Sequence, residues 1–591
     1  MNTTRVEDRL ADFTRDKRII ILSLMAVIIG AISAVVADIL VWLIAVITNL
    51  AFYQRFSSVF VSPEQNHLGA LVIIVPIIGG LIIGLTARYG SEKIRGHGIP
   101  EALEAILFGR SRMSPKVAVL KPLSSAISIG TGGPFGAEGP IIMTGGAVGS
   151  LFAQLFHLSS AERKTLLVAG AAGGMSAIFA SPVAAVLLAV ELMLFEWRPR
   201  SFIPVAIASA VAGALRVPLM GEGPIFPVSP HAALGGKGLL IAFAVGIIAG
   251  IASGILTNLV YGFEDLFERL PIHWMWWPAI GGLFVGVGGL IEPRVLGVGY
   301  DTIHSLLRGE VIGGALVGLL IGKSLVWSIA LGSGTSGGVL APLLIMGGAL
   351  GAFEARFIPI GDAGLWAIIS MAAMMGGTMR SPLTAMVFTL ELTHDLNLLP
   401  ALLIGTIAAH ALTVLLLRRS ILTEKVARRG FHITREYSVD PLTALRVEEV
   451  MDSNVPTIQA AMKVSELSDR IAQRDPQLTR RQGIPILNEE KKLVGIITRG
   501  DVLHALEEGA NTKTTVLDAG SRNLVVTYPD EILQEAVTKM LRNNIGRLPV
   551  VDRQAPHHLI GYLGRAAVMA ARLKLHEEEF VREQGLRVES A

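Results

Sequence analysis

The sequence predicts an all-α domain that crosses a membrane many times, followed by a smaller α/β soluble domain. Three observations predict this architecture. The 591 residues are 51% hydrophobic and 17% charged, with a mean hydropathy of +0.57, whereas soluble domains contain about 25% charged residues. About 12% of residues 19–440 are charged, against about 27% of residues 441–591. Glycine accounts for 64 residues, more than its average share of about 7%.

This composition excludes several classes of protein. So few charges would not keep a chain of this length in solution, and so much apolar sequence is not typical of a disordered chain. A disulfide scaffold is excluded because the chain has no cysteine. The net charge of +3 is too weak to indicate a nucleic-acid partner. The expected partner is a lipid bilayer.

The first predicted element is a long membrane helix. Residues 19–54 contain a single charged side chain, Asp38, and the run exceeds the roughly 20 residues that span a bilayer. It therefore predicts one tilted helix, or a helix with an interfacial extension. Residues 1–18 carry both signs of charge, with Arg15, Lys17 and Arg18 beside the span. This cluster predicts a cytosolic N-terminal segment.

Glycine and proline interrupt the apolar segments that follow. The interruptions are Gly96-His-Gly-Ile-Pro100, Gly130-Thr-Gly-Gly-Pro134, Gly136-Ala-Glu-Gly-Pro140 and Gly332-Ser-Gly-Thr-Ser-Gly-Gly338. In lipid, irregular backbone persists only where it is buried in protein or lines a watery cavity. Broken helices of this kind are typical of a transport site.

An internal repeat accompanies these breaks. Ser181-Pro182 leads to Glu191 with the same spacing with which Ser381-Pro382 leads to Glu391, 200 positions later, and a glycine pair precedes each motif. The glycine-rich loops that end at Pro140 and Pro342 are 202 positions apart. Two related halves, each with a broken helix, are a common plan for transporters. The predicted halves are residues 19–215 and 235–422.

These helix starts favour an anion. An N-terminal turn presents unpaired N–H groups and a partial positive charge, and Pro100, Pro140 and Pro342 stand where a helix can begin. Glu138 lies in one such start. Its carboxylate could occupy the anion site and leave or take up a proton when an anion passes, which would make it a gate. The alternative is that Glu138 only caps the helix.

Four segments resemble the CLC family of chloride channels and proton/chloride antiporters. They are Gly96-His-Gly-Ile-Pro100, Gly136-Ala-Glu-Gly-Pro140, Gly338-Val-Leu-Ala-Pro342 and the terminal Ser420-Ile-Leu-Thr-Glu-Lys-Val-Ala-Arg-Arg-Gly430. The resemblance covers most of residues 19–435. It implies a homodimer in which each subunit has its own anion path, and a membrane domain of two inverted halves.

The resemblance also implies roles for individual residues. Glu138 matches the family's gating glutamate. The backbone N–H groups expected to line the anion path belong to Gly98, Ile99, Gly139, Val339 and Leu340. Two further pore positions depart from the family pattern, because His97 stands in place of a serine and Leu422 in place of a tyrosine. Protonated His97 would attract an anion and make transport pH-sensitive; alternatively, a backbone carbonyl satisfies a neutral His97.

The proton path of an antiporter is less well marked. The position of the family's inner glutamate falls on Leu192, with Glu191 before it and Glu196 one turn later. Either carboxylate is a candidate, since charged groups inside a membrane are usually functional. The repetition of Glu191 as Glu391 instead favours a structural role for both. Proton-coupled antiport and passive conduction therefore both remain open.

The soluble tail contains two segments of similar plan, residues 446–508 and 512–575, followed by a solvated tail at 576–591. Each segment predicts a helix, two short strands and a second helix, an order that resembles a tandem of CBS domains. In the first module, Gly495-Ile-Ile-Thr-Arg-Gly-Asp501 fits the family pattern, so Thr498 and Asp501 are candidates to bind the phosphate and ribose of an adenine nucleotide. The alternative is that Asp501 only caps the following helix.

These features together predict a protein that transports chloride or a similar anion, with no required cofactor. No metal-ligand motif and no nucleophile–base set is evident, so we expect neither a metal site nor an enzyme. The alternative is a CBS-bearing divalent cation transporter, which would need more carboxylates in the membrane. The predicted location is the bacterial inner membrane, with both termini in the cytoplasm.

Overall fold

The computed structural model describes residues 18–430, 442, 445–475, 478, 482–507 and 514–580, and for residues 575–580 only the backbone. Residues 1–17, the boundary near 435 and residues 581–591 of the predicted tail lie outside this part of the chain. The chain divides into two compact units, Met1–Tyr437 and Ser438–Val581, and each is considered by itself.

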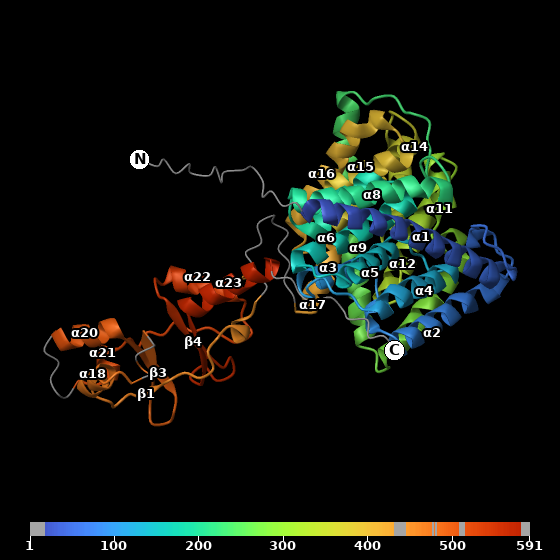
Figure 1. The fold of residues 1–591 in the computed structure, drawn as a ribbon. Coiled ribbons are helices and arrows are strands. Elements are labelled where there is room, and N and C mark those ends of the chain that lie inside the picture. Colours follow the sequence, from blue (N-terminus) through green and yellow to red (C-terminus); the bar gives the residue numbers. More distant parts are fainter. Residues whose placement is uncertain are drawn as a thin grey trace, which may run out of the picture. The chain divides into compact units, whose positions relative to one another are not determined.

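The first unit is built of helices, as predicted (Figure 1). Their bounds are α1 Arg18–Tyr53, α2 Ile74–Tyr89, α3 Ile99–Leu107, α4 Pro115–Gly130, α5 Glu138–Gln154, α6 Ser160–Phe179, α7 Pro182–Leu188, α8 Pro199–Met220, α9 Gly236–Glu268, α10 Trp277–Ile291, α11 Tyr300–Leu307, α12 Gly314–Gly332, α13 Leu340–Glu354, α14 Ala363–Met379, α15 Pro382–Thr393, α16 Leu399–Leu416 and α17 Ile421–Arg428. Within the described residues, eight helical segments are long and apolar enough to cross a membrane. The predicted break points coincide with helix starts, because α3, α5 and α13 begin within two residues of their prolines.

Glycine residues allow these helices to pack closely against one another. A Cβ added at Gly145 of α5 would lie 2.3 Å from the carbonyl oxygen of Gly170 in α6, and a Cβ at Gly170 would lie 2.1 Å from that of Gly145. Neither position accepts a side chain, so the two backbones are in direct contact. Small residues are the usual means by which helices approach closely in a membrane, which accounts for part of the high glycine content.

The two halves match element by element. The pairs are α1 with α9, α2 with α10, α3 with α11, α4 with α12, α5 with α13, α6 with α14, α7 with α15, and α8 with α16. Contacts between the halves are reciprocal: Glu391 accepts the N–H groups of Val183 and Ala184 at the start of α7, and Glu191 accepts those of Leu383 and Thr384 at the start of α15. Such an exchange indicates a two-fold relation between the halves.

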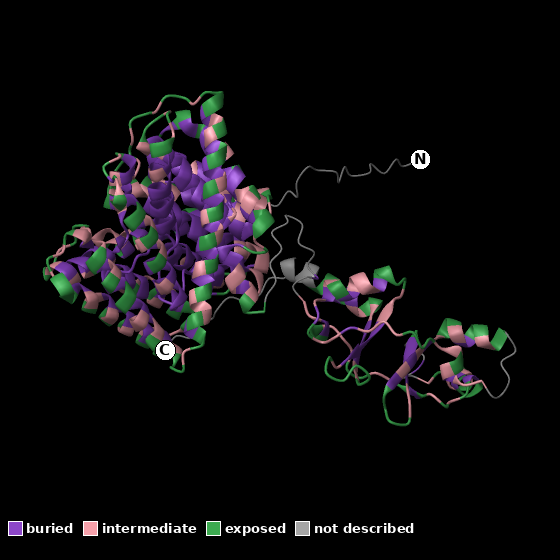
Figure 2. Cartoon of the chain, turned by 180° about the vertical axis from the view of Figure 1, so that it is seen from behind, coloured by how far each residue is buried: buried purple, intermediate pink, exposed green. Residues whose placement is uncertain are grey.

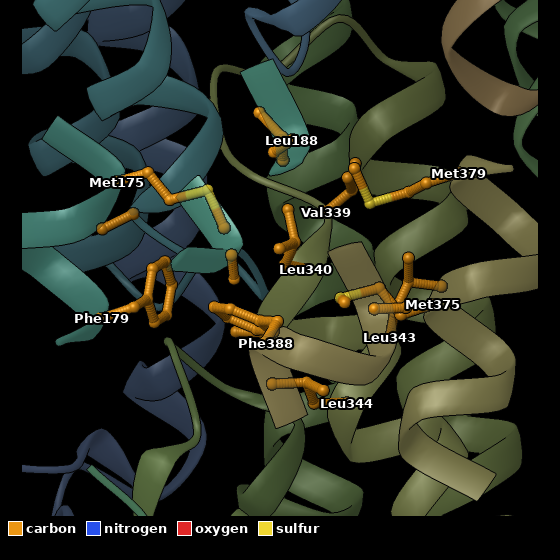
Figure 3. Close-up of a cluster of buried hydrophobic side chains, with 14 of the residues drawn as sticks. Met175, Phe179, Leu188, Val339, Leu340, Leu343, Leu344, Met375, Met379 and Phe388 are labelled. Carbon is orange, nitrogen blue, oxygen red and sulfur yellow. The ribbon is translucent and has the colours of Figure 1, made fainter. Parts of the chain in front are cut away.

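The core of this unit is continuous and apolar. Figure 2 shows buried residues throughout the helical unit and exposed ones around it. The largest fully buried side chains include Trp327 and Trp366. Near the start of α13, apolar side chains from α6, α7, α13, α14 and α15 meet, and Phe179 packs edge-to-face against Phe388 with ring centroids 5.0 Å apart (Figure 3).

The second unit is α/β, as predicted. Its strands are β1 Ile458–Gln459, β2 Gly483–Leu487, β3 Leu493–Thr498, β4 Arg547–Val551 and β5 Leu559–Gly564, and its helices are α18 Val464–Ala472, α20 Arg499–Glu507, α21 Val516–Ala519, α22 Leu533–Arg542 and α23 Arg565–Phe580. The order β1-β2-β3 forms one sheet and β4-β5 another, with β2 antiparallel to β3 and β4 antiparallel to β5. One apolar cluster joins α22, β4, β5 and α23 with Val447, and the other joins β1, α18, β2, β3 and α20 with Val516.

Candidate anion site

The carboxylate of Glu138 joins the two halves of the membrane unit. Glu138 is the first residue of α5 and is fully buried. Its Oε1 accepts the N–H of Leu340, the first residue of α13 in the other half. Its Oε2 has no hydrogen-bond partner. A carboxylate on the N-terminus of a helix occupies the place that an anion would take.

Two glycines make room for this carboxylate. Gly338 donates its N–H to the carbonyl oxygen of Gly136 over 2.8 Å, so the loops before α13 and α5 lie side by side. A Cβ added at Gly136 would lie 1.8 Å from Oε2 of Glu138, and a Cβ at Gly338 would lie 2.2 Å from Oε1. Any larger residue would therefore displace the carboxylate.

The start of α3 packs against the start of α5. A Cβ added at Gly139 would lie 2.0 Å from the carbonyl oxygen of His97, so these backbones touch directly beside Glu138. Gly98 has a positive φ of 90° and donates its N–H to Oε2 of Glu101 over 3.0 Å. The other oxygen of Glu101 accepts from Arg429 over 2.8 Å. In this structure the Gly98 amide is thus paired within its own helix.

His97 is buried, with 2% of its surface exposed. Neither ring nitrogen has a hydrogen-bond partner, so no backbone carbonyl satisfies the ring. The charged groups that interact with it electrostatically are Glu101, Lys425, Lys121 and Arg429. A buried polar side chain without a partner is costly, and Arg429 in this group is itself paired with Glu101 and Glu104.

The remaining residues that the sequence predicts along the anion path are apolar. Leu422 is fully buried in the first turn of α17, and this turn is capped by Ser420, whose Oγ accepts the N–H of Thr423 over 3.3 Å. Val339 and Leu340 are also fully buried, and Figure 3 shows their side chains among methionine and leucine side chains.

The candidate proton carriers lie apart from this centre. Leu192 is fully buried. Both oxygens of Glu191 bond to the start of α15, where Oε2 accepts the Thr384 N–H over 2.8 Å. Glu196 accepts from Ser201 over 2.5 Å and pairs with Arg198 at 3.5 Å. The structure thus brings Glu138, His97, Gly98, Gly139 and Leu340 together, and neither Glu191 nor Glu196 contacts that group through a recorded hydrogen bond.

Sequence reasoning missed three buried charges. Lys121 donates to the carbonyls of Ile94 and Gly96, over 2.8 and 2.7 Å, and fixes the turn before α3. Its repeat counterpart Lys323 donates to the carbonyls of Val295 and Gly297, over 2.8 and 3.2 Å. The two lysines are 202 positions apart, so the repeat period could have identified them. Glu101 could have been found as a capping residue three positions after Gly98.

In the first CBS-like module, Thr498 and Asp501 bond to each other. Oδ2 of Asp501 accepts the Thr498 N–H over 2.7 Å, and the Asp501 N–H donates to Oγ1 of Thr498 over 3.3 Å. This reciprocal pair caps α20. Within the described residues no group of three or more His, Asp or Glu side chains is arranged to hold a metal ion.

The fold and site define a multi-pass membrane protein of two related halves, with a carboxylate on a helix start between them. The family model for the voltage gated chloride channel matches residues 78–414, and the CBS domain model matches residues 447–508 and 516–574. The chain therefore belongs to the CLC family and carries two C-terminal CBS domains. Members of this family are channels or transporters, so the expectation of a non-enzymatic protein is confirmed.

Individual relatives agree with this assignment. The H(+)/Cl(-) exchange transporter ClcA of Salmonella arizonae is 29% identical over 431 residues, covering 70% of this chain and 90% of the relative; that of Salmonella agona is 28% identical with the same coverage. A slow cyanobacterial Cl-/H+ antiporter has a similar structure, with a TM-score of 0.62 and 22% identity over 70% of this chain and 99% of the other. A eukaryotic CLC transporter gives 0.61 at 17% identity over 92% and 97%. The structural likeness concerns the fold.

Proposed function

We propose that this protein exchanges chloride, or a similar small anion, for protons, and that Glu138 is the gate. One observation carries the proposal: the Glu138 carboxylate sits on the N–H of Leu340, at the start of a helix from the opposite half. An anion can take that place only when the carboxylate leaves, and protonation weakens its hold on the N–H. One group then serves both the anion and the proton.

Two further findings support exchange over passive conduction. The relatives with matching sequences are named as H(+)/Cl(-) exchange transporters, and the gate residue common to the family pattern is present here. A divalent cation transporter is not favoured, because among the described residues no group of three or more carboxylate or histidine side chains could hold a cation. We further propose a homodimer in a bacterial inner membrane with both termini in the cytoplasm.

The experiment uses the full chain reconstituted in liposomes. A pH gradient is imposed with the voltage clamped by a potassium ionophore, and chloride is present at equal concentrations on both sides. We expect chloride to move uphill, driven by proton flow in the opposite direction. If chloride does not move under these conditions, exchange is contradicted and a passive channel remains.

A second proposal concerns the CBS pair. CBS domains as a class bind adenosine ligands, and the first module contains the Thr and Asp of the pattern while the second does not. We infer one adenine nucleotide site that involves Thr498 and Asp501 and regulates transport. Their bond to each other supports the capping alternative equally well, so the test compares nucleotide binding with helix capping directly.

A further inference from the structure

The first turn of α3 holds a carboxylate that has no part in the exchange proposed above. Glu101 is buried, with 5% of its surface exposed, and its Oε2 accepts the Gly98 N–H over 3.0 Å. This N–H is one of those that the family resemblance places along the anion path. A negative charge on such an amide opposes an arriving anion, so the balance of this charge matters for transport.

Glu101 lies close to the centre of the candidate site. A Cβ added at Gly98 would lie 2.8 Å from the carbonyl oxygen of Gly139, the residue after Glu138, so the first turns of α3 and α5 are in direct contact. Glu101 also acts electrostatically on His97. Because these residues are buried, their charges are screened less than charges in water. A change of charge at Glu101 is therefore felt where the anion would bind.

Arg429, the residue after α17, balances this charge. Its Nη2 donates to Oε1 of Glu101 over 2.8 Å, and its Nη1 donates to Oε2 of Glu104 over 2.6 Å. The two oxygens of Glu101 are thus divided between an amide and a guanidinium, which stays protonated at every physiological pH. Further cations act on Glu101 from three places: Lys425 on α17, Lys121 on α4 and Arg95 before α3.

We propose that Arg429 is a positioning residue for anion binding: it holds Glu101 on the Gly98 N–H and cancels its charge, so that an anion can approach the first turn of α3. The inference rests on the anion transport proposed above, but not on its coupling to protons. Without Arg429, an uncompensated buried carboxylate would repel chloride. Without Glu101, the guanidinium would attract chloride more strongly. Changes at the two ends of this ion pair should therefore have opposite effects.

Chloride binding to the full-length protein in detergent tests this inference. All variants also carry Glu138→Gln and are compared at one pH by isothermal titration calorimetry, so that titration of the gate does not contribute. We expect Arg429→Gln to weaken chloride binding by about tenfold, and Glu101→Gln to strengthen it by a similar factor. Adding both changes together should bring the affinity back close to that of E138Q alone, because neither charge of the pair remains.

Arg428→Gln is the matched control. Arg428 pairs with Asp265 and Glu424 rather than with α3, so its loss should leave chloride affinity unchanged. Arg429→Lys keeps the positive charge and should largely preserve binding. A purely structural ion pair would lower the unfolding temperature in E101Q and R429Q alike, without opposite shifts in affinity. The inference is overturned unless the two single variants shift chloride affinity in opposite directions, or if R428Q weakens binding as much as R429Q.

Flux in liposomes separates this inference from the exchange itself. With Glu138 intact, R429Q should need about tenfold more chloride for half-maximal flux, while a pH gradient still drives chloride uphill. An unchanged chloride requirement in R429Q would contradict the role of Arg429 while exchange stands. If the unmodified protein does not pump chloride, proton coupling fails, and the opposite shifts in affinity still test Arg429.

Discussion

At the scale of the residue, the proposed exchange depends most on Glu138. In the proposed mechanism the charged carboxylate holds the Leu340 N–H, so the gate closes at high pH and opens as the pH falls. Glu138→Gln resembles the protonated side chain permanently. We expect flux that no longer varies with pH and a loss of uphill pumping, measured as chloride release from liposomes over a range of pH.

Glu354→Gln provides the matched control. Glu354 is also buried, at 8% exposure, and ends the helix that Leu340 begins. The same chemical change there should preserve the pH dependence of flux. If E354Q and E138Q both lose the pH dependence of chloride flux, that dependence cannot be assigned to Glu138 alone.

A second residue-scale prediction concerns Gly338. An alanine Cβ would lie 2.2 Å from Oε1 of Glu138, so Gly338→Ala should displace the carboxylate from Leu340. Hydrogen bonds to charged groups contribute about 1.5–3 kcal/mol, and losing this one should increase chloride flux at high pH by about tenfold or more. Gly254→Ala is the control, because a Cβ there meets nothing within 4 Å. Equal chloride flux in the two variants would contradict a blocking role for the bond between the Glu138 carboxylate and the Leu340 N–H.

The sequence predicts which residues belong to the candidate site, but not all the hydrogen bonds that they make or lack. The motif around Glu138 and the substitution at His97 are visible in the chain. That both nitrogens of His97 lack partners depends on helices brought together by folding. The pairing of Gly98 was partly predictable, since a glutamate three positions after a helix start is a capping pattern.

At the scale of the element, two buried lysines hold equivalent turns. Replacing Lys121 or Lys323 by methionine keeps the length of the side chain but leaves two carbonyls unpartnered. Each unsatisfied buried group costs about 1–3 kcal/mol, so both variants should unfold at lower temperature in detergent. Only K121M, whose lysine acts on His97, should also weaken chloride binding.

The exchanged glutamates make another element-scale prediction. Glu191 and Glu391 each cap a helix of the opposite half, and losing such a cap costs about 0.5–2 kcal/mol. Glu191→Ala and Glu391→Ala should therefore lower thermal stability similarly while chloride pumping persists. Pumping lost in Glu191→Gln at unchanged stability would instead place the proton route through Glu191.

The element plan was largely predictable because its signals are local. Proline and glycine mark the helix starts, and the 200-residue period pairs Glu191 with Glu391. The reciprocal capping was not predictable, because each glutamate bonds to backbone amides of the other half, and sequence periodicity does not say which surfaces meet.

At the scale of the whole molecule, the uneven charge separates an apolar helical unit from a soluble α/β unit. Adenine nucleotide should bind the full chain at up to millimolar concentration, and Asp501→Asn should abolish binding. Asp518→Asn is the matched control, since Asp518 caps α21 through the same reciprocal pair with Thr515. Equal binding by D501N, D518N and the unmodified chain would leave Asp501 as a helix cap.

The most direct test of the central claim is the reversal potential of the reconstituted protein in a pH gradient. With chloride equal on both sides, proton-coupled exchange predicts a reversal potential that departs from zero and changes sign when the pH gradient is inverted. Glu138→Gln should bring it back to zero. A reversal potential that stays at zero in the unmodified protein, whatever the pH gradient, would contradict the coupling of chloride to protons.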